Sequence, residues 1–407
     1  MFPQGLERYP DPLYEVGPDV EEPFAIMLRS HQLQDEEVPS SVRAIARCGA
    51  GTNNIPVDRM TERGIPVFNS PGANANAVKE LALCALLLSS RGVVQSIHAV
   101  DTLLSEETDP KVIKKRVEGE KKRFGGCELA GKKLGVIGLG HIGASVAASA
   151  LKLGMEVVGY DPAISVEAAW RLQAGVDRVL RIEELLTQVD YLSLHVPYMQ
   201  QTHHLLDLPA LQCLKPGCNI INFARGELVD VEALSAMYET GSYHGKYVSD
   251  FPEKSLVDNP NCLFMPHLGA STAEAEEISA AMAADELRDF LEHGIVRNSV
   301  NFPETNLKYR HSEAVRLVIV NENKPGVLGD ITTTLGSAEL NILQTVNASR
   351  GDIAINVVDL DPPPKAERDS AFESVQEAIH SLDGVISTRI LFGKEGTVKW
   401  KYFRTRE

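Results

Sequence analysis

Short apolar runs alternate with helix-period segments along most of the chain. The first runs lie near residues 24–28, 42–49 and 65–69, and each is closed by polar residues, glycine or proline. From Leu134 onward the runs recur more regularly, as LGVIG, MEVVGY, VDYLSLHV, NIINFA, KYVSDF and CLFMP. Strands that alternate with helices form parallel βα units, so this pattern predicts an α/β protein with a complete doubly wound domain.

The order of elements changes near the C-terminus. After helix-period residues 272–292 and a polar joint at 301–313, the pattern reads strand (315–320), helix (325–338), strand (341–346), strand (353–360), helix (368–382) and strand (384–391). The order βαββαβ is that of the ferredoxin-like split unit. The sequence therefore predicts a separate C-terminal module.

Composition narrows the classes of partner. The formal net charge of the 407-residue chain is -16 at pH 7, which disfavours the broad basic surface that nucleic acid or an anionic membrane needs. The longest apolar stretch, Leu81–Leu88, is far shorter than the roughly 20 residues of a membrane span. The N-terminus lacks a signal or transit pattern, so the expected location is the cytoplasm. The six cysteines are scattered without metal-ligand spacing, so no metal is expected.

One glycine pattern, Gly138-x-Gly140-x-x-Gly143, joins the strand LGVIG to a helix-period segment. In this Rossmann fingerprint, Gly138 permits a tight turn, Gly140 lets backbone amides approach a pyrophosphate, and Gly143 lets the helix pack on the strand. The next strand ends at Asp161, about 20 residues further on, where a carboxylate can bind both ribose hydroxyls and repel a 2′-phosphate. Pro162 follows, and no Arg or Lys is adjacent, so the pattern favours NAD over NADP.

Chemically useful side chains follow the ends of three successive predicted strands. Arg225 comes after NIINFA, Asp250 and Glu253 stand at the end of KYVSDF, and His267 comes after CLFMP. Ligands bind at this edge of an open α/β sheet. Oxidation of a 2-hydroxy acid needs a base for the hydroxyl proton, a cation for the carboxylate and a nearby nicotinamide. His267, Arg225 and bound NAD would supply these in turn, and Glu253 is the candidate carboxylate that fixes the tautomer of the imidazole.

Three segments resemble signature segments of the D-isomer-specific 2-hydroxy acid dehydrogenases, and within that family of the D-3-phosphoglycerate dehydrogenases. They are residues 128–143, 222–230 and 266–272, and the resemblance covers nearly the whole chain. It implies NAD-dependent oxidation of D-3-phosphoglycerate to 3-phosphohydroxypyruvate, the first step of the phosphorylated route to L-serine, with Arg225, Glu253 and His267 as the catalytic triad. It also implies contacts to NAD from the glycine loop and the strand ends, at His141, Ile142, Asp161, Val196, Pro197, Phe223, Ala224, Asp250, Gly269 and Ala270.

The segment that carries Glu253 departs from the family pattern. The usual run is Asp-Val-Phe-x-x-Glu-Pro, whereas this chain has the shorter run Asp250-Phe251-Pro252-Glu253-Lys254. The shortened form resembles a subgroup of the phosphoglycerate dehydrogenases.

The resemblance further implies a division into domains. We expect a discontinuous, flavodoxin-like substrate domain (residues 1–100 and 285–305), an NAD-binding domain (101–284), a C-terminal regulatory domain (314–393) and a tail (394–407), with catalysis in a cleft that closes. Members of the family act as homodimers or homotetramers. The apolar segment from about Ala75 to Ala99 is expected to form one long helix that serves as a dimer face.

Substrate identity depends on contacts to phosphate. Arg29 follows the run FAIML and matches a family position that holds the substrate phosphate, a task that suits a guanidinium fork. Arg47 precedes the segment Gly49-Ala50-Gly51, whose backbone amides are expected to line the cleft. By resemblance, Lys121 matches a basic residue that reaches the phosphate from the other subunit. The alternative is that these are ordinary surface charges.

Residues from about 315 to 393 resemble an ACT domain, a regulatory module of amino-acid biosynthetic enzymes. Gly326 would let a ligand approach a helix N-terminus, and Asn323 and Asn341 offer amide groups to an amino acid. Asn321 stands where the family often has histidine. The resemblance suggests regulation by L-serine, and the alternative is a purely structural dimerisation module.

Two other functions compete with the main hypothesis. A glyoxylate or hydroxypyruvate reductase would use the same chemistry, but such enzymes usually lack the C-terminal module and have no use for Arg29. A non-catalytic NAD-sensing corepressor would not need Arg225 and His267. Other histidines, such as the pair His203-His204, have no comparable arrangement and are expected to be structural.

Overall fold

The computed structural model describes residues 3–9, 14–307, 314–361, 368–391 and 401–406. Its contacts divide the chain into two compact units, Met1–Asn74 with Ala273–Glu407 and, separately, Ala75–Thr272. The units are called here the outer unit and the central unit.

The central unit is built on a seven-stranded parallel sheet. Its strand order is β11-β10-β9-β8-β5-β6-β7, in which the chain runs outward from β5 in both directions. This is the doubly wound arrangement that the sequence predicted, and ligands bind at the carboxyl edge of such a sheet. The strands are β5 (Lys133–Ile137), β6 (Glu156–Tyr160), β7 (Val176–Arg178), β8 (Tyr191–Leu194), β9 (Asn219–Asn222), β10 (Tyr247–Ser249) and β11 (Cys262–Phe264).

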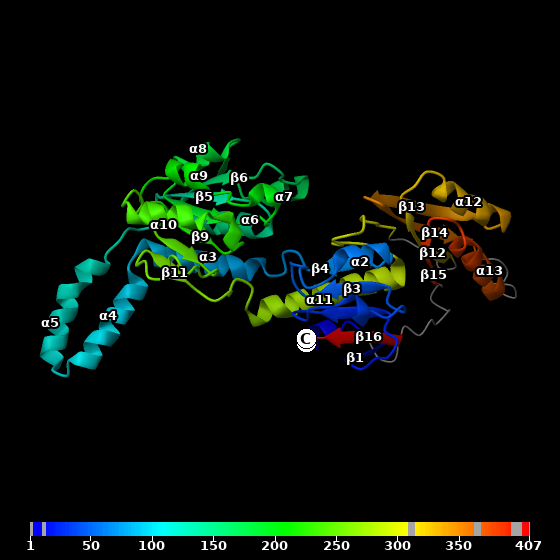
Figure 1. Cartoon of the computed structure of the whole chain (residues 1–407), viewed down its shortest axis with the longest axis horizontal. Helices are drawn as coiled ribbons and strands as arrows, with labels where there is room; N and C mark the ends of the chain where they lie inside the picture. Colours follow the sequence, from blue (N-terminus) through cyan, green and yellow to red (C-terminus); the bar gives the residue numbers. More distant parts are fainter. Residues whose placement is uncertain (1–2, 10–13, 308–313, 362–367, 392–400, 407) are drawn as a thin grey trace. The chain divides into compact units, whose positions relative to one another are not determined.

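Helices cover both faces of this sheet (Figure 1). On one face, α3 and α6 bury small and branched apolar side chains against β5, β9 and β10, among them Ala82, Leu86, Val146 and Ala147. The helices of the unit are α3 (Ala75–Ser90), α6 (His141–Lys152), α7 (Val166–Arg171), α8 (Ile182–Leu186), α9 (Leu208–Cys213), α10 (Val231–Glu239) and the short 3-10 helices η3 (Gln200–Thr202) and η4 (Gly226–Leu228).

A helical arm projects from the central unit (Figure 1). It consists of α4 (Val93–Glu106), α5 (Pro110–Glu120) and η2 (Lys121–Phe124). The single helix expected from Ala75 to Ala99 is therefore wrong, because the chain breaks at Gly92. The chain that returns from the helical arm crosses α3 at this point. The Gly92 N–H donates to the carbonyl of Phe124 at 3.1 Å, and a Cβ at Gly126 would lie 2.0 Å from the carbonyl oxygen of Ser90.

The outer unit contains a five-stranded parallel sheet in the order β1-β16-β2-β3-β4. Its strands are β1 (Glu15–Gly17), β2 (Ala25–Leu28), β3 (Ala44–Arg47), β4 (Val67–Asn69) and β16 (Lys401–Arg406), and its helices are α1 (Pro3–Leu6), η1 (Asp35–Glu37), α2 (Val57–Glu62) and α11 (Ala273–His293). Strand β16 lies between β1 and β2 and pairs in parallel with both. The segment 394–407, which the sequence analysis treated as a tail, thus contributes a strand to the interior of this sheet.

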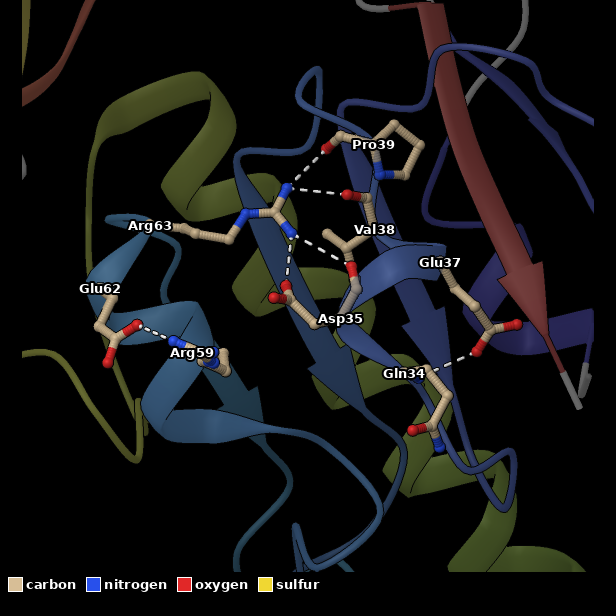
Figure 2. Close-up of polar contacts among 8 residues, drawn as sticks. All are labelled: Gln34, Asp35, Glu37, Val38, Pro39, Arg59, Glu62 and Arg63. Atoms are coloured by element: carbon tan, nitrogen blue, oxygen red, sulfur yellow. Dashed lines mark hydrogen bonds and ion pairs between the residues drawn. The ribbon is translucent and has the colours of Figure 1, made fainter.

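A polar clamp fixes the connection between β2 and β3 (Figure 2). The Arg63 guanidinium, just beyond α2, donates to the Asp35 carboxylate at 2.8 Å and to the carbonyl oxygens of Val38 and Pro39 at 2.8 and 3.2 Å. Within α2, Arg59 pairs with Glu62 (Figure 2). The clamp holds the loop that separates the two strands.

The C-terminal module has the predicted βαββαβ order. It comprises β12 (Val315–Glu322), α12 (Val327–Ser337), β13 (Ile342–Arg350), β14 (Ile353–Leu360), α13 (Arg368–His380) and β15 (Val385–Leu391), with an antiparallel sheet in the order β13-β14-β12-β15. One sheet face packs on α12 and α13, and the other shares a core with α11.

The limits of the two units differ from the domain limits expected from the sequence. The breaks fall at 74/75 and 272/273, whereas the sequence suggested 100/101 and 284/285. The physical reason is packing: α3 lies against α6 and the seven-stranded sheet, and α11 lies against β2, β3 and β4.

Candidate active site

The glycine loop between β5 and α6 has the geometry that each glycine position requires. Gly138 has a φ of 89°, and a side chain at this position would approach the carbonyl oxygen of His195 to 2.7 Å. A Cβ at Gly143 would lie 1.9 Å from the carbonyl oxygen of Gly138. At Gly140, the N-cap of α6, no described atom lies within 4 Å of the Cβ position. The loop is therefore tightly packed on its inner side and open at the helix N-terminus, which fits a pyrophosphate.

Asp161 follows β6 and contacts the same loop. One carboxylate oxygen accepts from the N–H of Leu139 at 2.8 Å, and the other accepts from the N–H of Ala163 at 3.0 Å. Val196, beyond β8, also lies at the loop, since its Cγ1 is 2.8 Å from the Cβ position of Gly138. These contacts bring two expected cofactor residues to the glycine loop.

His141 and Ile142 occupy the first turn of α6. Partial burial lowers the pKa of His141, and the positive charge of Arg171 on α7 lowers it further. The sequence analysis did not place Arg171 near the glycine loop, because nothing in the local pattern shows where α7 packs.

Arg225 lies just beyond β9, where a buried asparagine shapes the turn. The Asn222 side chain accepts from the N–H of Ala224 at 3.2 Å and donates to the carbonyl of Arg225 at 2.8 Å. The Arg225 guanidinium donates to the carbonyl of Ala224 at 2.6 Å. Phe223, in the same turn, is buried.

Asp250, beyond β10, anchors the loop that carries His267. It is 1% exposed, and its Oδ2 accepts from the N–H of Gly269 at 2.9 Å. Its Oδ1 is buried and has no hydrogen-bond partner among the described residues. A buried acceptor without a partner is costly, so this oxygen is suited to a donor on a ligand.

Glu253 and His267 line one pocket at the carboxyl edge of the sheet. The other lining residues come from the segments beyond β9 and β10 and from the loop before α9, namely His204, Gly226, Glu227, Val229, Val231, Asp250, Phe251 and Pro252. In the described part of the chain, no hydrogen bond or ion pair joins Glu253 to His267. The contact shown for the imidazole is with Phe251, whose ring centroid lies 5.0 Å from that of His267 at an interplanar angle of 58°.

Two residues of this pocket were missed by sequence reasoning. His204, expected to be structural, lines the pocket, has a φ of 47° and lies with its Nδ1 3.9 Å from the Asp230 carboxylate. Phe251 was noted only as part of an unusual motif. Arg225 is outside the lining set, although its neighbour Gly226 belongs to it.

The expected phosphate residues of the outer unit lie together at the ends of β2 and β3. Arg29 forms an ion pair with Glu276 in the first turn of α11. The Arg47 Nε donates to the carbonyl of Arg29 at 3.3 Å. Gly49 has a φ of 144°, and a Cβ there would lie 2.4 Å from Arg47 Nη1. Glycine at this position thus gives the Arg47 guanidinium room beside the turn 49–51.

The remaining expected residues lie elsewhere. Lys121 is exposed on the helical arm and pairs with Glu118. In the C-terminal module, the Asn321 side chain is buried, donates to the Glu322 carbonyl and accepts from Asn356 at 2.7 Å. Gly326 has a φ of 96° and open space around its Cβ position. The Asn323 side chain donates to the Gly351 carbonyl, and the Asn341 side chain donates to the Asp361 carboxylate.

No group of three or more histidine, cysteine or carboxylate side chains suited to a metal ion occurs among the described residues. Nor does the described part of the chain include a helix long and apolar enough to cross a membrane.

Comparison with known proteins extends these observations. The family model "D-isomer specific 2-hydroxyacid dehydrogenase, NAD binding domain" matches residues 102–269. The D-3-phosphoglycerate dehydrogenase of Haemophilus influenzae is 33% identical over 356 residues, which cover 84% of this chain and 79% of that protein.

Two solved structures are also similar. An NAD+-bound 3-phosphoglycerate dehydrogenase of Entamoeba histolytica is 27% identical, with a TM-score of 0.53 over 68% of this chain and 82% of that one. A glyoxylate reductase of Paecilomyes thermophila is likewise 27% identical, with a TM-score of 0.56 over 68% and 83% of the two chains.

The doubly wound sheet, the glycine loop with Asp161, and the charged residues at three neighbouring strand ends define a nicotinamide-dependent dehydrogenase. With the matches above, the chain belongs to the D-isomer-specific 2-hydroxy acid dehydrogenase family. It is an NAD-dependent oxidoreductase.

Proposed function

We propose that this protein oxidises D-3-phosphoglycerate to 3-phosphohydroxypyruvate with NAD, as the first step of a phosphorylated route to L-serine. The observation that supports this substrate best is the pair of guanidinium groups, Arg29 and Arg47, at the ends of adjacent strands in an otherwise acidic protein. Curated relatives that cover most of the chain are phosphoglycerate dehydrogenases.

The residues of the central unit fit NAD. The pyrophosphate would bind at the open N-terminus of α6, at Gly140, His141 and Ile142, and the ribose hydroxyls would bind Asp161. The free Oδ1 of Asp250 suits the amide donor of a nicotinamide carboxamide. The segments beyond β8, β9 and β11 would complete this site with Val196, Pro197, Phe223, Ala224, Gly269 and Ala270. When bound, NAD+ accepts the hydride from C2 of the substrate.

His267 is the proposed base. It takes the proton of the C2 hydroxyl while the C–H bond at C2 breaks, so that a carbonyl forms and the hydride leaves with both bonding electrons. Arg225 would bind the substrate carboxylate through its guanidinium fork. Glu253 shares the pocket with His267 and would orient the protonated imidazole once the substrate is bound, because catalytic hydrogen bonds often tighten only in the complex.

A rate assay tests the substrate. We expect 3-phosphohydroxypyruvate to support NADH consumption with a much higher kcat/KM than hydroxypyruvate or glyoxylate. Preference for the unphosphorylated acids would instead identify a glyoxylate or hydroxypyruvate reductase. Similarity to the Paecilomyes glyoxylate reductase is the observation that favours this alternative. His267→Asn should lower kcat by about 10²- to 10⁴-fold.

The phosphate site has its own test. Arg29→Ala should raise the KM for 3-phosphoglycerate and leave the KM for NAD unchanged, since a charge-assisted phosphate contact is lost. Arg59→Ala is the matched control, because this arginine lies in the same unit and pairs with the exposed Glu62 on its own helix. Equal changes in both KM values, or a similar effect of the control, would argue against the site.

The C-terminal module is proposed to be an ACT domain that binds L-serine. Asn323, Gly326 and Asn341 lie near the start of α12 and of β13, where a small amino acid would find amide groups and helix N–H donors. Asn321 would contribute least, because its side chain is already bonded within the sheet. Saturating L-serine should change the rate or raise Tm, and D-serine should do neither. If L-serine also does neither, the module is structural.

The assembly is proposed to be a homodimer or a homotetramer. Apolar side chains are exposed along α3 and the arm, namely Leu87, Val93, Ile97, Val100, Leu104, Val112 and Val117. A second copy that covers them would bring Lys121 of the arm toward the other subunit's substrate. Light scattering tests the assembly.

The proposed location is the cytoplasm. The cysteines are free, which agrees with this location.

A further inference from the structure

We propose that Phe251 is a positioning residue that holds the His267 imidazole for proton transfer. The inference rests on the proposed role of His267 as the base. It starts from the tilted contact between the two rings, which are 5.0 Å apart, and from the position of both residues in one pocket.

The imidazole has few other restraints. His267 is exposed, and none of the side-chain hydrogen bonds or ion pairs found among the described residues involves its ring. Glu253 is in the same pocket without a bond to it. Before substrate and cofactor arrive, the ring of Phe251 is therefore a contact that can limit the rotation of the imidazole. An aromatic ring can do this because tilted ring pairs have preferred geometries.

Phe251 is itself held from several directions. Its N–H donates to the hydroxyl of the fully buried Ser249 at 3.1 Å, and Pro252 restricts its backbone to extended conformations. Against Gly226 the fit is close: a Cβ at Gly226 would lie 3.3 Å from Phe251 Cβ and 3.6 Å from its Cγ. The ring thus lies between the turn that follows Arg225 and the loop that carries His267.

The shortened motif brings an aromatic residue directly next to the buried Asp250 in the sequence. In Asp250-Phe251-Pro252-Glu253, the residue after the buried aspartate is aromatic, and the carboxylate follows two positions earlier than in the longer pattern. Asp250 fixes the backbone of the His267 loop through Gly269, but it does not reach the imidazole. Phe251 supplies the side-chain contact that this backbone anchor lacks.

The test replaces the ring and keeps its bulk. Phe251→Leu should lower kcat by about 10- to 10²-fold, because small misplacement of a catalytic group is costly, and should leave the KM for NAD unchanged. Phe251→Tyr, which restores a ring, should recover most of the rate. Val189→Ala is the matched control, since Val189 is buried in the hydrophobic core of the central unit and does not line the pocket. Tm and NAD affinity confirm that each variant is folded.

A spectroscopic measurement tests the contact without turnover. In protein labelled at histidine and phenylalanine, the His267 ring resonance is assigned by its loss in His267→Asn. We expect it to show a nuclear Overhauser effect to the Phe251 ring in the unaltered protein. It should shift in Phe251→Leu but not in the control Val189→Ala.

The outcomes separate the two proposals. If Phe251→Leu keeps the kcat of the unaltered enzyme, or if the His267 resonance does not move, the positioning role is refuted while the proposed function stands. If the unaltered protein turns over no 2-hydroxy acid, the proposed function fails and the proposed effect on rate fails with it. A resonance shift in that case still establishes the ring contact.

Discussion

Glu286 on α11 gives the sharpest prediction of stability against pH. Its side chain is 3% exposed; Oε1 accepts from the Asn298 amide at 2.6 Å, while Oε2 is buried without a partner among the described residues. Burial raises the pKa of this carboxyl to about 8. The Asn298 hydrogen bond and the charge of Arg297 lower it, and the charge of Asp285 raises it, but burial dominates.

The sign follows from proton binding. The ordinary pKa of the carboxyl is 4.5, so between pH 4.5 and about 8 the folded state retains a proton that the unfolded state has released. The free energy of unfolding therefore falls as the pH rises through this window, and the loss levels off above pH 8. Each pH unit of the window is worth about 1.4 kcal/mol, so the full loss is on the order of 4–5 kcal/mol.

Glu286→Gln isolates this effect. Glutamine can keep the bond from Asn298, and its buried amide hydrogens cost about 1–3 kcal/mol at every pH. Relative to the unaltered protein, the variant should gain stability steadily from pH 5 to 8 in denaturant titrations. Glu274→Gln is the control, because this carboxylate is exposed at the start of the same helix and is not among the charges that act on Glu286. A difference between Glu286→Gln and the unaltered protein that stays constant from pH 5 to 9 would refute the reasoning.

Three further predictions concern the rest of the fold. Arg316→Leu leaves the buried carboxylate of Asp359 unpaired and should cost about 3–5 kcal/mol in denaturant titrations, most of which the double change with Asp359→Leu should recover. Ending the chain at Leu391 removes β16, so Tm should fall and amide exchange at β2 should quicken; unchanged exchange would contradict the pairing. Gly143→Ala places a Cβ 1.9 Å from a carbonyl oxygen, so NAD binding should be lost in calorimetry while the outer unit stays folded.

The fold of the central unit was predictable because its signals are local. Each strand is a short apolar run, and the glycine pattern determines the turn into α6. The outer sheet was not fully predictable. Strand β16 lies far along the chain from the strands with which it pairs, and no local pattern reports such pairing. The break after α3 has a similar cause, since Gly92 is placed by a chain crossing more than 30 residues away in sequence.

The candidate site also combines features that local sequence signals predict with features that depend on packing. The rule that ligands bind at strand ends brought Arg225, Asp250 and His267 to one sheet edge, where β9, β10 and β11 are neighbours. It could not identify His204, whose place in the pocket depends on how the loop before α9 packs. The local pattern around Asn321 also gave no sign that its side chain bonds across the sheet to Asn356.

The packing of α11 bears on how the C-terminal module should be regarded. Two arginines of the module bind carbonyl oxygens in the last turn of this helix: Arg389 donates to Phe290 and Arg316 to His293, each at 2.7 Å. Such carbonyls lack partners within a helix, and cations are favoured at this end. The module also buries apolar side chains in the core formed with α11, namely Val318, Val320, Ile353, Ile355 and Leu391. Since α11, which packs on the five-stranded sheet, shares carbonyl contacts and core packing with the module, the module is an integral part of the outer unit.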